Sequence, residues 1–112
     1  MPSATATDMD AMRAAATDAA ALLRLMSNED RLLLLCQLSQ GECCVGALEA
    51  LLDIRQPTLS QQLGVLRNEG VVATRREGKH IYYRVSDERV LQLLQLLYDM
   101  FCAPAPRSRR HR

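Results

Sequence analysis

The residues of this 112-residue chain that can take part in the most kinds of reaction are its four cysteines, Cys36, Cys43, Cys44 and Cys102. Thiolates attack electrophilic sulfur, pair as disulfides and bind soft metal ions. Because acidic residues at positions 8, 10 and 18 exclude a secretory signal, we expect a cytosolic protein with reduced thiols. Reduced cysteines act as metal ligands or redox groups, or they are small buried hydrophobic residues.

Enzymatic and metal chemistry find little support in the sequence. A thiol oxidoreductase would need a Cys-x-x-Cys motif, and neither that motif nor a Ser/His/Asp set nor a glycine-rich phosphate loop is present. A tight zinc site takes four nitrogen or sulfur ligands, which the cysteines with His80 and His111 do not assemble. We therefore expect neither an enzyme, nor a cofactor, nor a bound metal.

A second group of residues suits nucleic acid, as the distribution of charge indicates. The formal net charge of the chain is only +1, yet residues 55–84 carry six basic and two acidic side chains. Residues 1–54 carry three basic and eight acidic ones, and residues 103–112 carry four arginines and no acid. Such local clusters attract phosphate backbones whatever the total charge, although a solvated surface strip has the same composition.

The elements that must position these residues are mostly helical. The chain is rich in leucine and poor in aromatic residues, and no apolar run approaches the ~20 residues of a membrane span. Apolar spacing and end signals predict helices over residues 9–26, 29–38, 45–52, 56–68 and 87–102. Strands over residues 71–76 and 80–85, joined through residues 77–79, predict a β-hairpin.

Local signals also set the expected ends and the domain limits. Ser27 or Asn28 is the expected N-cap of the second helix, Ser86 caps the last, and Pro57 suits the first turn of the fourth. The last helix is apolar on more than one face, which predicts that it also packs against a second copy of the chain. We expect one domain over residues 9–102, between a disordered N-terminus at 1–8 and a basic flexible tail at 103–112.

Two short helices separated by a three-residue turn have the spacing of a helix-turn-helix. In the second, Leu59, Leu63 and Leu66 must point inward, so hydrogen-bonding side chains face outward. Amides and hydroxyls pair with base edges and cations with phosphates, although an ordinary polar surface is the alternative for this helix alone. The expected DNA-binding residues of the helix and hairpin are Gln56, Thr58, Ser60, Gln61, Gln62, Arg67, Arg75, Arg76, Lys79 and His80.

The chain resembles the ArsR-type bacterial repressors in their recognition helix and wing. The residues that carry the resemblance are QPTLSQQLGVLRNEG at 56–70 and VVATRREGKHIYYRV at 71–85. The resemblance covers about residues 20–102 and implies a mainly α, winged helix-turn-helix fold with a β-hairpin wing. It also implies a cytoplasmic homodimer that binds operator double-stranded DNA, has no membrane partner, and dissociates from DNA when an effector occupies a separate site.

The same resemblance narrows the chemical class of effector that we expect this protein to sense. Metal-sensing members use two cysteines one residue apart at the start of the third helix, and here Cys44 matches the first while Gly46 stands at the second. The contexts of Cys36 and Cys102 are similar to the persulfide- and sulfide-responsive branch, the BigR- and SqrR-like repressors. In that branch a per- or polysulfide reacts with one such thiol, and the second resolves the product into a bridge.

The resemblance thus implies a repressor that senses reactive sulfur species through Cys36 and Cys102 and releases DNA when the pair is bridged. Arg24 and Arg31 are the nearest basic residues in the sequence that could favour a thiolate at the second helix. A metalloid sensor that uses Cys43, Cys44 and a third thiol is the alternative. A constitutive DNA-binding protein with inert cysteines is another.

Overall fold

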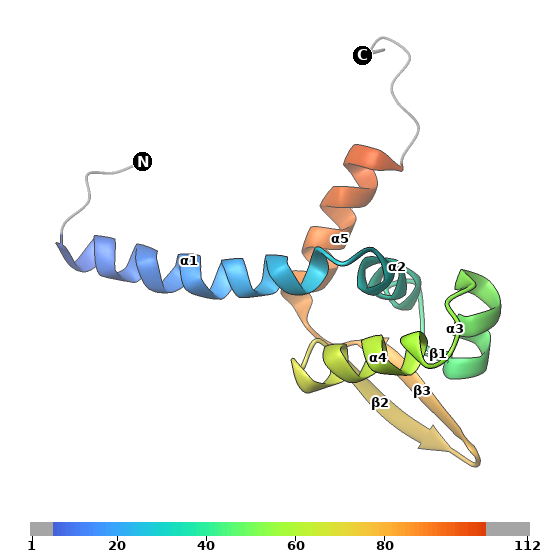
Figure 1. The fold of residues 1–112 in the computed structure, drawn as a ribbon. Coiled ribbons are helices and arrows are strands. Elements are labelled where there is room, and N and C mark those ends of the chain that lie inside the picture. Colours follow the sequence, from blue (N-terminus) through green and yellow to red (C-terminus); the bar gives the residue numbers. More distant parts are fainter. Residues whose placement is uncertain (1–5, 103–112) are drawn as a thin grey trace, which may run out of the picture.

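Helix α2 (Glu29–Leu38) lies at the centre of the computed structural model, which describes residues 6–102 (Figure 1). Three of its side chains, Leu34, Leu35 and Leu38, are almost fully buried. The helices in contact with it are α1 (Ala6–Met26), α3 (Val45–Leu52) and α4 (Thr58–Asn68). Its N-terminus is capped by Asn28, whose side-chain oxygen accepts from the Arg31 N–H at 3.0 Å. The second helix of the sequence is therefore the core of the domain.

A small antiparallel sheet projects from this core as a hairpin (Figure 1). Its strands are β1 (Cys43–Cys44), β2 (Val72–Glu77) and β3 (His80–Val85), in the spatial order β1-β3-β2. The β2–β3 register pairs Val72 with Val85 and Glu77 with His80, so the turn has two residues. Gly78 takes the first of them with φ +62°, the left-handed conformation that two-residue hairpin turns require.

The junction between α4 and β2 is fixed by a glycine. Gly70 has φ +78° and follows the last helical residues, where its N–H donates to the Arg67 carbonyl. The next N–H, that of Val71, donates to the Leu66 carbonyl at 3.2 Å. This pair of bonds is the Schellman arrangement, which satisfies the free carbonyls at a helix end. It sets the direction of the wing relative to α4.

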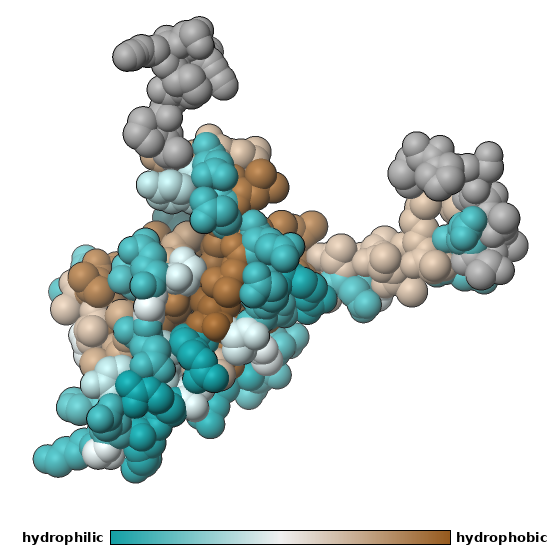
Figure 2. Space-filling model, turned by 180° about the vertical axis from the view of Figure 1, so that it is seen from behind, coloured by the Kyte–Doolittle hydropathy of each residue, from teal (hydrophilic) through white to brown (hydrophobic). Residues whose placement is uncertain are grey.

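Two helices extend away from the core, α1 and α5 (Glu88–Phe101) (Figure 1). Helix α5 buries Val90 and Leu94 but exposes most of its later apolar side chains, which are Leu96, Tyr98, Met100 and Phe101. Helix α1 likewise exposes Met9, Met12 and Leu23. Hydrophobic colours lie along both helices in Figure 2. The radius of gyration, 17.3 Å, exceeds the roughly 13 Å of a compact domain of this length.

The expected fold class is confirmed, a mainly α fold with a β-hairpin wing, and three local expectations are corrected. Helix α1 begins at Ala6 rather than residue 9, so residues 6–8 belong to it. Helix α4 begins at Thr58 rather than 56, because Pro57 is its N-cap residue and the Gln56 side chain bonds to its first turn from outside. The N-cap of α5 is Asp87, which accepts from the Arg89 N–H.

The remaining differences are small. Ser86, the expected cap of α5, instead donates its hydroxyl to the Gly70 carbonyl at 3.3 Å. Strand β1 was not expected, since two residues carry no readable period. The expected basic tail and residues 1–5 lie outside the described residues. Within residues 6–102, none of the helices combines the length and apolar character needed to cross a membrane.

A substitution of Leu48 in α3 tests the packing of the core. Leu48→Ala is expected to lower the free energy of unfolding by about 2–5 kcal/mol, because it leaves a cavity where the side chain is fully buried. The matched control is Leu51→Ala on the same helix, where the side chain is 59% exposed and the expected change is within about 0.5 kcal/mol. Chemical denaturation followed by circular dichroism measures both, and equal losses would contradict the packing described.

Candidate DNA interface and dithiol site

Helix α4 places its leucines and its polar residues as the sequence predicts. Leu59, Leu63 and Leu66 are buried against the core. On the other side, Ser60, Gln61 and Arg67 are exposed, together with Gln56 just before the helix, while Thr58 and Gln62 are half-buried. The helix therefore presents a surface of hydrogen-bonding groups with a cation near its C-terminus, which is the chemistry that base edges and phosphates accept.

Several of these groups are already hydrogen-bonded within the chain. The side-chain oxygen of Gln56 accepts from the Ser60 N–H at 3.1 Å and from the Ser60 hydroxyl at 2.7 Å. The side-chain oxygen of Gln62 accepts from Nη1 of Arg31 at 3.1 Å. Within residues 6–102, Thr58 and Gln61 have no side-chain partner. Gln61 is thus the glutamine whose amide keeps both donor and acceptor free.

The wing carries the expected cations in two different states. Arg76, Lys79 and His80 are exposed, and in the part of the chain that the structure describes none of them forms an ion pair. Arg75 instead binds both carboxylate oxygens of Glu42 through Nε at 2.9 Å and Glu77 through Nη1 at 2.8 Å. The guanidinium also lies 4.8 Å from the centre of the Tyr82 ring.

Glu42 precedes β1, so its pair with Arg75 ties the start of the helix-turn-helix to the wing. The hydrogen bond from Arg75 holds the pKa of the Glu42 carboxyl below its ordinary value. The pair is exposed, so its contribution to stability is small. Its effect is to orient Arg75 along the sheet and to offset the charge that was expected to bind phosphate.

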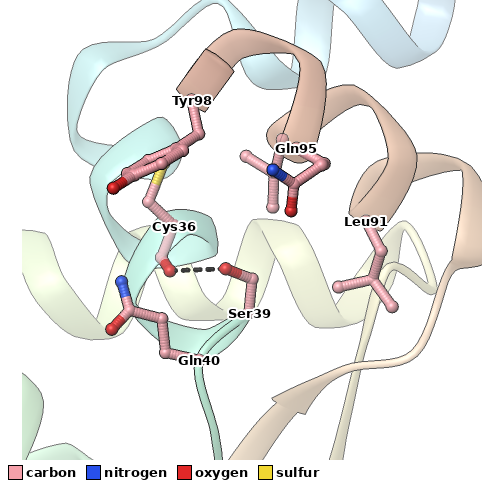
Figure 3. A pocket seen from close by; sticks show the side chains of 7 residues that line it. Cys36, Ser39, Gln40, Leu91, Gln95 and Tyr98 are labelled. Carbon is pink, nitrogen blue, oxygen red and sulfur yellow. Dashed lines mark hydrogen bonds between the residues drawn. The ribbon is translucent and has the colours of Figure 1, made fainter. Parts of the chain in front are cut away.

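A pocket of about 460 Å³ lies between α2 and α5, with Cys36 in its wall (Figure 3). The other lining residues come from the turn after α2 and from α5: Ser39, Gln40, Leu91, Leu94, Gln95 and Tyr98. The Tyr98 ring lies beside the Cys36 sulfur in Figure 3. None of these lining residues is charged. The pocket thus offers a small, uncharged or weakly charged molecule access to a thiol.

The two cysteines expected to act together interact electrostatically. Burial by neighbouring groups raises the pKa of the Cys36 thiol, and the charge of the Cys102 thiolate raises it further. Cys102 follows the last residue of α5 and is exposed, as Cys36 is on α2. The fold therefore brings near each other two thiols that are 66 positions apart in the sequence.

The expectation that Arg24 or Arg31 would favour a Cys36 thiolate is wrong. Nε of Arg31 donates to the Leu25 carbonyl at 2.7 Å, and its other nitrogens bond to Gln62 and to the Arg24 carbonyl. Neither arginine lowers the pKa of Cys36, which is raised. At neutral pH this thiol is accordingly mostly protonated, and its reaction depends on the small thiolate fraction.

Cys43 and Cys44 lie elsewhere, on β1, paired with Tyr83 and Tyr82 of β3. Neighbouring residues of a strand point to opposite faces of the sheet, so these two thiols do not converge. Cys44 is also the N-cap residue of α3 and makes no side-chain cap bond. Among residues 6–102, no group of three or more His, Cys, Asp or Glu side chains is placed to hold a metal ion.

Sequence reasoning missed three contributors to these sites. They are Tyr98, which lines the pocket with Cys36, Arg31, which donates a hydrogen bond to Gln62, and Glu42, which accepts hydrogen bonds from Arg75. The apolar stripe of α5 placed Tyr98 on that helix but not over the thiol. For the other two, no local signal existed, because the partners lie 31 and 33 residues apart.

The chain is similar to known regulators. Residues 28–74 match the family described as bacterial regulatory protein, arsR family. A biofilm growth-associated repressor of Agrobacterium fabrum is 55% identical over 86% of this chain and 82% of its own. The crystal structure of the transcriptional repressor BigR from Xylella fastidiosa has a TM-score of 0.79 and 48% identity, covering 86% of this chain and 98% of that one. The structure of reduced HlyU from Vibrio cholerae N16961 has a TM-score of 0.79 and 38% identity, covering 82% of this chain and 97% of that one.

The two states of the wing cations lead to a prediction. Arg76→Gln is expected to lower the salt-dependence slope of duplex binding by about 1, since each neutralised phosphate contributes ~0.9. Arg75→Gln is expected to change the slope much less, because Glu42 and Glu77 already balance that charge. Fluorescence anisotropy titrations at several KCl concentrations measure both slopes. An equal change in the two variants would show that Arg75 leaves its carboxylates when DNA binds.

Proposed function

This chain belongs to the ArsR family of bacterial regulatory proteins and is a transcriptional repressor rather than an enzyme, and we propose that it senses reactive sulfur species. In this proposal a homodimer in the cytosol binds operator DNA through α4 and the wing while its thiols are reduced. A per- or polysulfide then bridges Cys36 to Cys102, and the bridged protein releases the DNA. One observation carries the proposal: Cys36 lies in the wall of a pocket that α2 forms with α5, and the charge of Cys102 raises the pKa of the Cys36 thiol.

The homodimer is supported by the exposed apolar side chains of α1 and α5. In one chain these helices extend beyond the core with large hydrophobic residues in water. Tyr98 is 51% and Phe101 76% exposed. Contiguous exposed apolar surface on a small domain indicates a partner, and a two-fold axis covers the same surface on both copies. A dimer formed in this way includes the end of α5 that carries Cys102.

The proposed chemistry takes two displacement steps. A thiolate of the pair attacks the outer sulfur of a persulfide R–S–SH, which forms Cys–S–SH and releases the thiolate RS⁻. The second cysteine thiolate attacks Sγ of the first cysteine, which forms the Sγ–Sγ disulfide, breaks the Sγ–SH bond and releases HS⁻. The two thiols are oxidised and the sulfane sulfur is reduced to sulfide. A polysulfide donor can leave additional sulfur in the bridge by the same steps.

The effect on DNA follows from the position of the bridge. A disulfide requires Cα atoms about 4.4–6.8 Å apart, so bridging sets the distance between the end of α5 and the last turn of α2. In the proposed dimer, α5 also contacts its copy, and a change in its direction alters the separation of the two α4 helices. Those helices must match half-sites one turn of DNA apart, about 34 Å.

The relatives are consistent with this proposal. The BigR structure and the Agrobacterium fabrum relative are repressors by name, and the HlyU structure is described as reduced. A reduced form is a chemically meaningful state only for a protein with oxidisable groups. A metalloid sensor that uses Cys43 and Cys44 has no comparable support, since their thiols do not converge.

The switch predicts a dependence on two cysteines. Treatment of the reduced wild-type protein with inorganic polysulfide is expected to weaken operator binding by about tenfold or more, in the range of allosteric coupling. Cys36→Ser and Cys102→Ser are each expected to bind DNA normally and to lose this response. Fluorescence anisotropy gives the affinity, and intact-mass spectrometry gives the sulfur added.

The matched controls are Cys43→Ser and Cys44→Ser, which are expected to respond like the wild type. Equal DNA affinity before and after treatment of the wild type, with the bridge detected by mass, would reject the switch. A response that persists in Cys36→Ser and disappears in Cys44→Ser would favour the metalloid-type cysteines instead.

The raised pKa of Cys36 predicts how its reactivity depends on pH. Because the pKa is raised, the thiolate appears only at alkaline pH, and alkylation by iodoacetamide should accelerate about tenfold per pH unit between about pH 7 and pH 9 without a plateau. In Cys102→Ser one of the two causes is removed, so the profile is expected to move to lower pH while burial keeps part of the shift. Peptide mass spectrometry follows Cys36 alone, and an unmoved profile would show that the thiols are electrostatically independent.

A further inference from the structure

Arg31 joins three helices next to the proposed DNA-reading surface, which consists of the exposed polar side chains of α4 and the wing. It lies in the first turn of α2, and its guanidinium donates to the Leu25 and Arg24 carbonyls at the end of α1. Its Nη1 reaches across to α4 and donates to the side-chain oxygen of Gln62 at 3.1 Å. Arg31 is half-buried and forms no ion pair with any described residue. Its hydrogen-bonding capacity is directed at these three oxygens.

The chemistry of this contact fixes the orientation of the Gln62 amide. A guanidinium has five donors and no acceptor, so the atom that faces it must be the amide oxygen. The amide nitrogen, on the other branch of the same planar group, therefore points away from Arg31. No side chain of the described residues bonds to it. A glutamine that is free can turn an acceptor and a donor together towards a base. The Gln62 oxygen is instead turned towards Arg31, which occupies one of its two acceptor positions, and the amide nitrogen keeps two free N–H donors.

The base edges of the major groove differ in the donors and acceptors that they present to the Gln62 amide. Adenine presents one acceptor and one donor and pairs with a whole amide, whereas guanine presents two acceptors, N7 and O6, and cytosine presents a donor. We propose that Arg31 is a positioning residue for base recognition. By holding the Gln62 oxygen towards α2, it leaves the amide nitrogen as the group that Gln62 turns towards a base, so that Gln62 selects guanine, rather than adenine, at one position of each half-site. This inference rests on the DNA binding in the proposed function and is independent of the sulfur switch.

The proposal separates the two glutamines next to each other on α4. Gln61 is exposed and has no partner among the described side chains, so its amide can pair with adenine in the ordinary bidentate way. Gln62 is half-buried on the flank of the helix that faces α2. The same residue type thus reads different bases at adjacent positions, because only one of the two has Arg31 beside it.

A merely structural role for Arg31 predicts something different. Loss of its bonds to the carbonyls of α1 would loosen that helix and weaken binding to every duplex by the same factor. A positioning role changes the preferred base at one position and leaves the others unchanged. The preference profile therefore distinguishes the two roles, and overall affinity does not.

The experiment is a selection from a library of randomised duplexes by the full-length protein under reducing conditions, repeated with Arg31→Ala and Gln62→Glu. The wild type is expected to select guanine at the position concerned. Arg31→Ala frees the Gln62 oxygen and is expected to shift that position towards adenine. Gln62→Glu keeps the contact with Arg31 but offers only acceptors, and is expected to shift the same position towards cytosine. Anisotropy on single-substitution duplexes should give preferences of at least about fivefold, the lower end of a base-edge contact.

The control is Gln61→Glu, which is expected to change the preference at a different position and to leave the guanine in place. If Arg31→Ala does not fold, the base preference of Gln62→Glu alone tests the inference, since this variant retains the bond to Arg31. Selection of adenine by the wild type at the position that Gln62→Glu alters would overturn the inference. Unchanged base preferences in Gln62→Glu would also overturn it. If the wild type enriches no sequence at all, the proposed DNA binding fails and the inference with it.

Discussion

The burial of one face of α2 is the constraint on which the rest of the structure depends. Leu34, Leu35 and Leu38 are packed so closely that α2 has a single position relative to α1, α3 and α4. The other faces of the same helix carry Cys36 towards α5 and Arg31 towards α4. A displacement of α2 large enough to matter would therefore reach both the thiol pocket and the DNA-reading surface.

Hydrogen bonds within the chain and contacts with DNA draw on the same groups. Each bond that a polar side chain makes inside the protein removes one donor or acceptor from the set that DNA can use. The oxygen of Gln56 is bonded to Ser60, and Arg75 is bonded to two carboxylates. These bonds cost little in stability to break because they are exposed. Their consequence is for specificity: they determine which hydrogen-bonding groups of α4 and the wing remain free for the proposed contacts with DNA.

Prediction from sequence succeeded where a feature depends on neighbours along the chain. The limits of α3 and the inward side chains Leu59, Leu63 and Leu66 follow from helical spacing, and the hairpin follows from Gly78 in its turn. It failed where partners are distant in sequence. The raised pKa of Cys36 depends on how α5 crosses α2, and the neutralised charge of Arg75 depends on Glu42, which lies in the acidic half of the chain. Charge counted by segment cannot reveal that a basic and an acidic zone meet.

Regulation needs an element that moves at low cost, and the end of α5 has this property. Val90 and Leu94 anchor its first half in the core, whereas the side chains beyond Leu94 are largely exposed in one chain. Bending this end onto α2 leaves the buried leucines in place, so the core does not oppose it. In the proposed switch, the energy for the change comes from the new covalent bond, and the resistance comes from the second copy that would cover Tyr98 and Phe101. Because coupling between the equilibria at two sites is reciprocal, DNA that holds the proposed dimer in its reading geometry must in turn disfavour the proposed bridging of the thiols.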